Sequence, residues 1–271
     1  MKATHAVVVR IPNSLKFDDK KLVSKVDLPL ARRQQQEFND ILRESGVDVI
    51  ELSLEDNANV SALFIDDVAV VINGTALMTR PKRSTSPIAG ELRATLAELA
   101  WNVVDTPAQE HGKTVVLEGS DVFYAGREIF VGIRKGGTNI EGALVVGRIF
   151  ADIPVVPIPI GGSMPLKYYV SLAADNILTV SKSKESQSIL HRIERDATFR
   201  YKIVTLENDD YVNCINLNGR LIFRPDSTGT RFGVLQSIVE LWGVAASEMA
   251  TIATPMSRFV LLVNRLPTAR L

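Results

Sequence analysis

Five segments of this chain carry apolar residues at the spacing of an α-helix, and they recur at a steady interval. In each segment an apolar residue returns every three or four positions, which places an apolar stripe on one helix face. The expected helices span residues 29–44, 87–101, 139–150, 184–195 and 230–242. Their centres lie about 45–60 residues apart, a spacing typical of repeat architectures. Such repetition constrains the fold strongly, because each unit must bury its apolar face against its neighbours.

Short runs with high β-propensity lie between the expected helices, and several are apolar throughout, which suits strands covered on both faces. The expected strands are residues 6–9, 48–52, 68–73, 76–80, 114–117, 121–124, 129–132, 155–158, 178–181, 210–216, 220–224 and 259–264. The pair Asn218-Gly219 is the strongest hairpin signal in the chain. Five units of a few strands and one helix favour an α/β fold in a closed radial array. No linker rich in proline, glycine or serine divides the chain, so we expect one domain over residues 1–271.

The charge balance and the hydropathy argue against two classes of protein. With 31 Lys+Arg against 31 Asp+Glu the formal net charge is zero, and a nucleic-acid partner would need a basic surface. No apolar run approaches the ~18 residues that a membrane helix needs, so we expect no membrane span. The chain enters its first expected strand without the apolar core of a signal peptide. We therefore expect an intracellular protein in the cytoplasm, with a mitochondrial location as the alternative.

The chain is poor in residues that bind metals or act as nucleophiles. It holds one cysteine, Cys214, and three histidines, His5, His111 and His191. One cysteine excludes a disulfide within the chain and a cysteine-based metal site, and we expect no metal and no cofactor. Cys214 lies in a β-rich run, where a free cysteine is usually packed in the core. None of the histidines has a neighbour in the sequence that would make it catalytic.

Acidic residues stand at the beginning of two apolar strands. Asp66 and Asp67 precede the run at 68–73, and Glu118 and Asp121 border the run at 121–124. Acids at strand ends beside tight turns can converge on a cationic ligand. The plainer alternative is that they are solvated residues of surface turns.

Segments along the whole chain carry a resemblance to one family. They include Ala3-Thr4-His5-Ala6, Phe64-Ile65-Asp66-Asp67-Val68, Thr79-Arg80-Pro81, Leu117-Glu118-Gly119-Ser120-Asp121, Gly126-Arg127-Glu128, Thr138-Asn139, Leu166-Lys167, Asn213-Cys214-Ile215 and Leu262-Val263-Asn264. On these residues the chain closely resembles the dimethylarginine dimethylaminohydrolases, also called dimethylargininases. The resemblance implies the pentein fold, a five-bladed α/β propeller built from ββαβ units. That fold agrees with the rhythm of five units.

The resemblance also implies a chemistry. In this family a cysteine thiolate attacks the guanidinium carbon of a methylated arginine, a histidine moves protons, and carboxylates hold the guanidinium. Citrulline and a methylamine are released. The thiolate is needed because a neutral thiol is a poor nucleophile, and the histidine serves as general acid and base.

The sequence departs from the family pattern at both catalytic positions. Pro165, in Ser163-Met164-Pro165-Leu166-Lys167, stands where the family has its histidine. Arg258 stands where the family has its nucleophile, shortly before the last expected strand. Proline has no side chain that can move protons, and arginine is neither a nucleophile nor a base at neutral pH.

The substrate-binding residues of the family are partly retained. The resemblance places residues 84–87 and Gly136-Gly137 where the family has two substrate-binding arginines. Of the acids, Asp67 matches the family pattern, Asp66 replaces a glutamate, and Glu118 matches an acid of the catalytic group. The resemblance implies that Asp66 and Asp67 are the vestige of a binding site for a guanidino ligand, and that Glu118 stands at a catalytic position.

Two functions from different classes follow. The first is a dimethylargininase-like pseudoenzyme that acts as a protein-binding or structural subunit of a larger assembly. The alternative is a hydrolase of methylated arginines with a non-standard active site, in which Asp66, Asp67 and Glu118 position a water. A further hypothesis is that the Arg258 guanidinium fills the old substrate position and pairs with one of these carboxylates, because a buried charge needs a partner.

Overall fold

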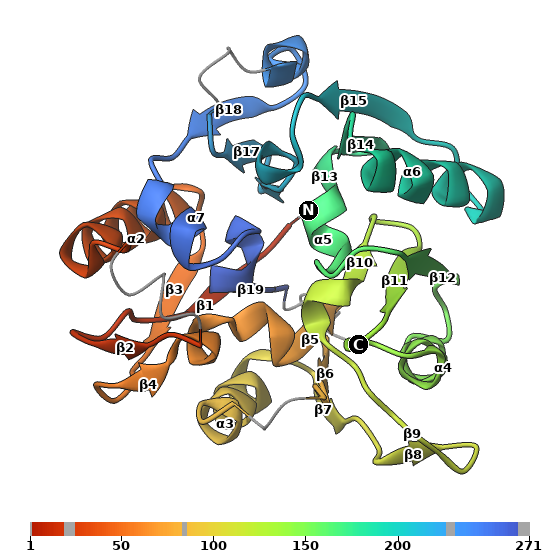
Figure 1. Cartoon of the computed structure of the whole chain (residues 1–271), viewed down its shortest axis with the longest axis horizontal. Coiled ribbons are helices and arrows are strands. Elements are labelled where there is room, and N and C mark those ends of the chain that lie inside the picture. Colours follow the sequence, from red (N-terminus) through yellow and green to blue (C-terminus); the bar gives the residue numbers. More distant parts are fainter. Residues whose placement is uncertain (1, 19–24, 83–85, 226–230, 265–271) are drawn as a thin grey trace, which may run out of the picture.

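Five three-stranded sheets stand around a central axis in the computed structural model, which describes residues 2–18, 25–82, 86–225 and 231–264 (Figure 1). The innermost strands are β19 (Val260–Val263), β5 (Ala69–Ile72), β10 (Val122–Tyr124), β13 (Val170–Ala174) and β16 (Cys214–Leu217). The middle strands are β1 (His5–Val9), β6 (Thr75–Met78), β11 (Ile129–Arg134), β14 (Ile177–Ser181) and β17 (Arg220–Phe223). The outer strands are β3 (Asp48–Leu52), β7 (Asn102–Asp105), β12 (Val155–Ile160), β15 (Lys202–Leu206) and β18 (Glu240–Gly243).

Every sheet has the same pairing. The innermost strand pairs antiparallel with the middle strand, and the middle strand pairs parallel with the outer one. The antiparallel pairs that follow each other in sequence need only a short turn, such as Asn218-Gly219 between β16 and β17, whose φ angles of 50° and 88° are both positive. The predicted α/β propeller of ββαβ units is confirmed.

A parallel pair needs a crossover, and in four of the sheets a helix supplies it. These helices lie on the outside of the ring: α2 (Leu28–Glu44), α3 (Ala89–Leu99), α4 (Ile140–Ile149) and α6 (Lys184–Asp196). Helices α2, α3 and α6 bury the predicted apolar stripe, as Phe38 and Leu42 of α2 show with 1% and 0% exposure. Helix α4 buries Val145 and Val146 and leaves Ile140 and Leu144 exposed. The sequence predicted the positions of all four helices, because the helical spacing of apolar residues is a local property of the sequence.

The fifth predicted helix, residues 230–242, is wrong. Residue 230 lies outside the described residues, Arg231–Leu235 form a 3₁₀ helix (η5), and Glu240–Gly243 form β18. Gly233 and the β-branched Ile238 and Val239 lower the helix propensity of this segment. Its last residues gain a parallel ladder with β17 instead. The helical spacing was misleading here because Phe232 and Leu235 are buried from a 3₁₀ turn just as they would be from an α-helix.

Smaller elements complete the chain. They are β2 (Leu15–Lys16) paired with β4 (Ala58–Asn59), β8 (Gln109–Glu110) paired with β9 (Lys113–Thr114), and the short helices α5 (Leu166–Tyr169) and α7 (Ser247–Ile252). The strand predicted at 114–117 is reduced to its first residue, and the strand predicted at 210–216 begins only at Cys214. Strands β7, β13, β15 and β18 were not predicted. No helix among the described residues combines the length and apolarity that crossing a membrane requires.

The first and last strands of the chain share one sheet. Strand β19 pairs antiparallel with β1, so that Ala6 faces Leu262 and His5 faces Val263. Thr4 and Val263 continue this ladder with a backbone hydrogen bond of 2.9 Å. The ring of sheets is therefore closed by the two ends of the described chain.

A short turn of helix precedes each innermost strand. These turns are η2 (Ile65–Asp67) before β5, η3 (Gly119–Asp121) before β10, α5 before β13, η4 (Asp209–Tyr211) before β16 and η6 (Met256–Phe259) before β19. Because the five strands run side by side around the axis, several of these turns meet at one end of it; η2 packs on both η3 and η6. Side chains that are distant in sequence are thereby brought together there.

A buried carboxylate holds two neighbouring sheets together. Glu128, which is 0% exposed, precedes β11 and accepts hydrogen bonds from residues just before β15. The donors are the backbone amides of Thr198 (2.9 Å) and Phe199 (3.2 Å) and the hydroxyl of Tyr201 (2.8 Å). A charged acceptor of this kind satisfies three donors at once.

Replacing this carboxylate should weaken the fold. We expect Glu128→Ala to lower the free energy of unfolding by about 3 kcal/mol, because it removes three hydrogen bonds worth about 1 kcal/mol each. Glu128→Gln keeps one acceptor oxygen and should lose less. Urea unfolding followed by circular dichroism measures both. The control is Glu207→Ala, an exposed acid whose ion pairs are worth about 1 kcal/mol or less; equal losses in the two alanine variants would contradict the prediction.

Candidate functional site

Four carboxylates converge at one end of the axis. Asp66 and Asp67 come from η2, Asp121 ends η3, and Glu118 immediately precedes η3. The two turns approach so closely that a Cβ on Gly119 would lie 1.9 Å from the carbonyl oxygen of Asp66. Only glycine fits at that position, and its small size lets the two acidic segments share one site.

Arg134 binds two of the acids at once. It lies at the end of β11, and its side chain is 11% exposed. Its Nε donates to both oxygens of Asp121 (3.0 and 3.1 Å), and its Nη2 donates to Glu118. Its Nη1 donates to the carbonyl oxygen of Ser163 at 3.1 Å. All three nitrogens of the guanidinium are therefore engaged within the chain.

Asp121 is the most deeply buried of the four acids, with 0% exposure. Besides Arg134 it accepts hydrogen bonds from the hydroxyl of Thr138 (2.9 Å) and from the backbone amide of Leu166 (3.1 Å). The latter is the first residue of α5, so this carboxylate fixes the start of the turn that carries Lys167. Asp121 thus joins three parts of the site.

Lys167 neutralises Asp66. Its Nζ lies 2.6 Å from Oδ1 of Asp66, and the two side chains are 20% and 7% exposed. Burial raises the pKa of Asp66 above its ordinary value, and the Lys167 ammonium opposes this shift. The pair is held where water reaches it poorly, so each charge depends on the other.

Arg258 neutralises Asp67. It lies on η6, and its Nη2 donates to Oδ2 of Asp67; the two side chains are 18% and 17% exposed. The guanidinium carbon lies 4.0 Å from the centre of the Phe64 ring, in the arrangement of a cation–π contact. The sequence suggested Asp66, Asp67 or Glu118 as partners of Arg258, and the structure pairs it with Asp67.

Some polar atoms of the site have no hydrogen-bond partner. Burial also raises the pKa of Glu118, against the opposing charge of Arg134. Among the described residues, Oδ2 of Asp66, Oδ1 of Asp67 and Nε of Arg258 are buried without a hydrogen-bond partner. Such groups are costly inside a protein, which indicates that four acids and three cations were brought together for a reason other than stability.

The remaining family positions carry no reactive group. Pro165 is buried and acts as the N-cap residue of α5. Gly136, with a φ of 88°, forms the turn between Arg134 and Thr138. Of the segment 84–87, residues 84 and 85 lie outside the described residues.

The cysteine and the histidines lie outside the cluster of charges. Cys214 is buried at the start of β16, and burial raises the pKa of its thiol to about 11. The expected packed free cysteine is therefore observed. The histidines approach acids elsewhere: His5 with Asp48, His111 with Glu110 and His191 with Glu194. In the part of the chain that the structure describes, no group of three His, Cys, Asp or Glu side chains could hold a metal ion.

Comparison with known proteins identifies the relatives of this chain. It is 26% identical to the human protein named putative hydrolase DDAH2 over 280 residues, which covers 98% of this chain and 96% of that protein. It is 30% identical to the N(G),N(G)-dimethylarginine dimethylaminohydrolase of Streptomyces coelicolor over 154 residues, 56% of this chain and 57% of that one. Its homologues are therefore dimethylarginine dimethylaminohydrolases and proteins named after them. No family model matches the sequence.

Solved structures agree on the fold. The dimethylarginine dimethylaminohydrolase of Pseudomonas aeruginosa, solved as a cysteine-to-serine mutant in complex with citrulline, superposes with a TM-score of 0.76 at 18% identity. The superposition covers 97% of this chain and 100% of that one. The five-bladed ring is therefore the pentein fold of the dimethylarginine dimethylaminohydrolase family.

Sequence reasoning missed two members of the site. Arg134 and Lys167 supply two of its three cations, yet neither was assigned a role. A signal existed in each case, because Arg134 is the first charge after the apolar run at 129–133 and Lys167 is the last charge before the all-buried strand β13. A charge at such a position must find a partner or reach solvent.

Removing Arg258 should leave a site that fits a free guanidinium. We expect Arg258→Ala to lose about 2–4 kcal/mol of unfolding free energy, because Asp67 remains half-buried without its partner. Methylguanidine at millimolar concentration should then raise the melting temperature of the variant in a saturable manner, while methylammonium and urea should raise it less. The wild-type protein is the control, since its own arginine occupies the position. Equal responses of wild type and variant would contradict this prediction.

Proposed function

We propose that this protein is a dimethylargininase-like pseudoenzyme, which does not hydrolyse methylated arginines and acts as a binding subunit of a protein assembly. The observation that carries the proposal is the ion pair of Arg258 with Asp67 over the Phe64 ring. The residue that stands at the family's nucleophile position presents a guanidinium, the group that the family's substrates present. The protein's own side chain therefore takes the place of a ligand.

The chemistry around this ion pair supports the loss of hydrolysis. The family reaction needs a thiolate and a proton-transferring histidine, and Arg258 and Pro165 can supply neither. The one thiol is buried, and its pKa is raised to about 11, so at neutral pH it stays protonated. Catalytic groups that act together lose most of their effect when one is removed, and here two are replaced.

The carboxylates are also poorly suited to activate a water. Glu118 and Asp121 are bound by Arg134, Asp66 by Lys167, and Asp67 by Arg258. A general base must have a lone pair directed at the water it activates. Each carboxylate is held by a cation of the chain, and the oxygens that lack a partner, Oδ2 of Asp66 and Oδ1 of Asp67, are themselves buried. The alternative of a non-standard hydrolase therefore has little support.

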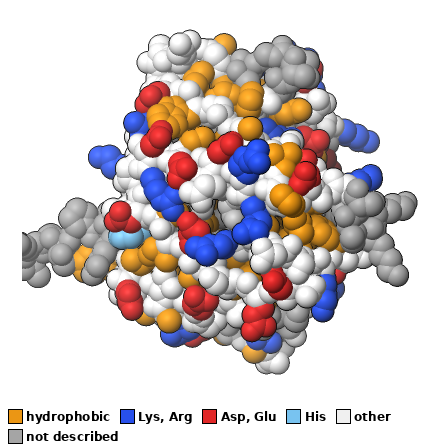
Figure 2. All heavy atoms as spheres, turned by 90° about the vertical axis from the view of Figure 1, so that its left-hand side faces the viewer, with side chains coloured by type: hydrophobic (Ala, Val, Ile, Leu, Met, Phe, Trp, Pro, Cys, Tyr) orange, Lys and Arg blue, Asp and Glu red, His pale blue; other side chains and the backbone are white. Residues whose placement is uncertain are grey.

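The outer surface supports a role in binding proteins. Ile140 and Leu144, one turn apart on α4, are 44% and 48% exposed, and Val234 and Ile238 are 70% and 58% exposed. The latter two lie in the crossover of the fifth blade, where the described residues form the 3₁₀ helix η5 in place of an α-helix. On the face that carries α2, Lys and Arg side chains lie among Asp and Glu side chains (Figure 2), a distribution that suits protein contacts better than a nucleic-acid backbone.

Hydrolysis is tested directly. We expect no citrulline release above background when the purified protein is incubated with asymmetric dimethylarginine or monomethylarginine. An active dimethylargininase assayed in parallel is the positive control. Release that persists in repeated preparations and disappears in Asp66→Asn or Glu118→Gln would overturn the pseudoenzyme proposal in favour of the hydrolase.

Binding is tested in the native source. We expect affinity purification to recover this protein with a partner protein at constant stoichiometry through size exclusion. Val234→Asp combined with Ile238→Asp should weaken the association if the exposed residues of the fifth blade form the contact. The control pair is Ile140→Asp with Leu144→Asp, at exposed apolar residues of α4 in another blade. Recovery of a free monomer that binds methylated arginines would instead indicate a ligand sensor.

A further inference from the structure

One side chain from each innermost strand faces the axis of the ring. They are Val71, Tyr124, Leu172, Asn216 and Leu262. Val71, Tyr124, Asn216 and Leu262 remain partly accessible although their strands are otherwise buried, as the pattern of β5 shows with only its third residue accessible. Such residual accessibility in the middle of a buried strand indicates a hollow axis. Four of the five side chains are apolar or aromatic.

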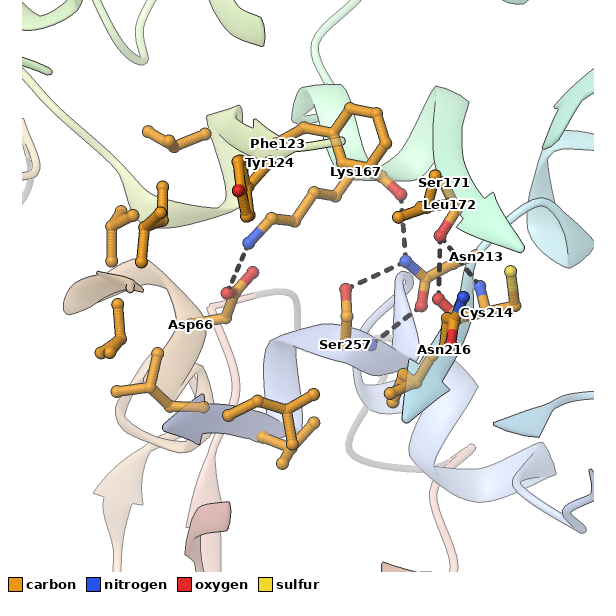
Figure 3. A pocket seen from close by; sticks show the side chains of 18 of the residues that line it. Asp66, Phe123, Tyr124, Lys167, Ser171, Leu172, Asn213, Cys214, Asn216 and Ser257 are labelled. Atoms are coloured by element: carbon orange, nitrogen blue, oxygen red, sulfur yellow. Dashed lines mark hydrogen bonds and ion pairs between the residues drawn. The ribbon is translucent and has the colours of Figure 1, made fainter. Parts of the chain in front are cut away.

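Hollows lie on both sides of this ring of residues. The first is a cavity of about 140 Å³ that reaches from the ring to Asp66 and Lys167 (Figure 3). The second, of about 200 Å³, opens at the opposite end and is bordered by Lys2, Asn73 and Asp175. Both are lined by Val71, Tyr124, Leu172 and Leu262. The ring of Val71, Tyr124, Leu172 and Leu262 therefore forms an apolar constriction of the axis, which we call the waist. Polar residues lie on both sides of it: Lys2, Asn73 and Asp175 at the mouth, and Asp66 and Lys167 at the floor.

The floor offers hydrogen-bond donors. Lys167 reaches across the cavity to Asp66, and among the described residues its ammonium donates only to Oδ1 of that acid. An ammonium carries three donors. Ser257 accepts a hydrogen bond of 2.9 Å from Nδ2 of Asn213, and its own hydroxyl donates to no described residue. The amide of Asn213 is otherwise occupied by the carbonyl of Lys167 and the amide of Ser257.

We propose that the axis is a binding site for a linear aliphatic molecule that ends in an oxygen acceptor, entered from the face opposite the charge cluster. The apolar waist takes the chain, and the acceptor meets the donors of Lys167 and Ser257. A mostly apolar pocket with a few convergent polar groups is the usual form of a small-molecule site. The inner cavity approaches the about 150 Å³ of an engineered apolar cavity that takes up benzene.

The donors at the Lys167 end of the cavity determine which head group of a ligand can bind there. An amine is protonated at neutral pH and presents only donors, which would face the ammonium of Lys167. A hydroxyl, carbonyl or carboxylate presents lone pairs to the same group. Water can fill the polar end of the cavity, but the apolar side chains of the waist offer it no hydrogen bonds. The inner cavity thus favours a chain with an oxygen at its leading end.

Titration of the purified protein with a homologous series tests the site. We expect butanol, hexanol and octanol to bind with affinity that rises about fourfold per added methylene, the equivalent of about 0.8 kcal/mol. Hexanoate should bind at least as well as hexanol, and hexylammonium should bind about tenfold more weakly. Isothermal titration calorimetry measures all of these. Absence of saturable binding, or equal binding of hexanol and hexylammonium, would overturn the proposal.

Two variants locate the binding. Val71→Phe narrows the waist and should reduce the affinity for octanol about tenfold or more, whereas Val204→Phe, at a half-buried valine of β15 away from the axis, should not. Thermal unfolding of both variants establishes that they are folded. Asp66→Asn with Lys167→Met removes both floor charges together. It should abolish the advantage of hexanoate over hexanol while octanol still binds. Equal affinities in all variants would contradict the assignment to the axis.

Discussion

Charge that is taken out of water must be neutralised where it stands, and this requirement organises the centre of the molecule. Asp121 is fully buried, and Asp66 is nearly so. An isolated carboxylate in such a place would cost several kcal/mol, about the whole stability of a domain. The cations that prevent this come from different blades, Arg134 from the third, Lys167 from the fourth and Arg258 from the last segment before β19. The acids are therefore neutralised only when the blades of the ring have come together.

The repeated architecture explains why these groups can meet at all. Each blade enters its innermost strand through a short helical turn, and parallel placement of those strands brings neighbouring turns to one end. A side chain on any such turn is directed to the site by the fold itself. Change of residue type at a turn then alters the chemistry without altering the scaffold. Arg258 and Pro165, which the family resemblance places at the nucleophile and histidine positions, both lie at such turns, and both turns are intact.

The sequence predicted the features that depend on local periodicity and on the family resemblance. The five units and four helices followed from apolar spacing. The family resemblance suggested that Arg258 pairs with Asp66, Asp67 or Glu118, and the structure shows Asp67. It could not predict that residues 240–243 leave the helical pattern, because a parallel ladder with β17 decides that segment. It also could not assign Arg134, whose importance lies in joining acids 13 and 16 residues away along the chain. Pairings across the ring are tertiary properties that spacing does not encode.

The Asp66–Lys167 pair divides the axis into two unequal parts. On one side stand the remaining charges, each engaged with another group of the chain, and on the other lies the cavity bordered by Val71 and Leu262. An enzyme keeps some of its polar groups unpaired for the substrate and loses stability in doing so. In this chain most of that free capacity at the charged end has been consumed by arginine and lysine. The donors of Lys167 that face the cavity are the part of the site still open, so a ligand of the axis would meet the protein on the side of this ion pair away from Arg134 and Arg258.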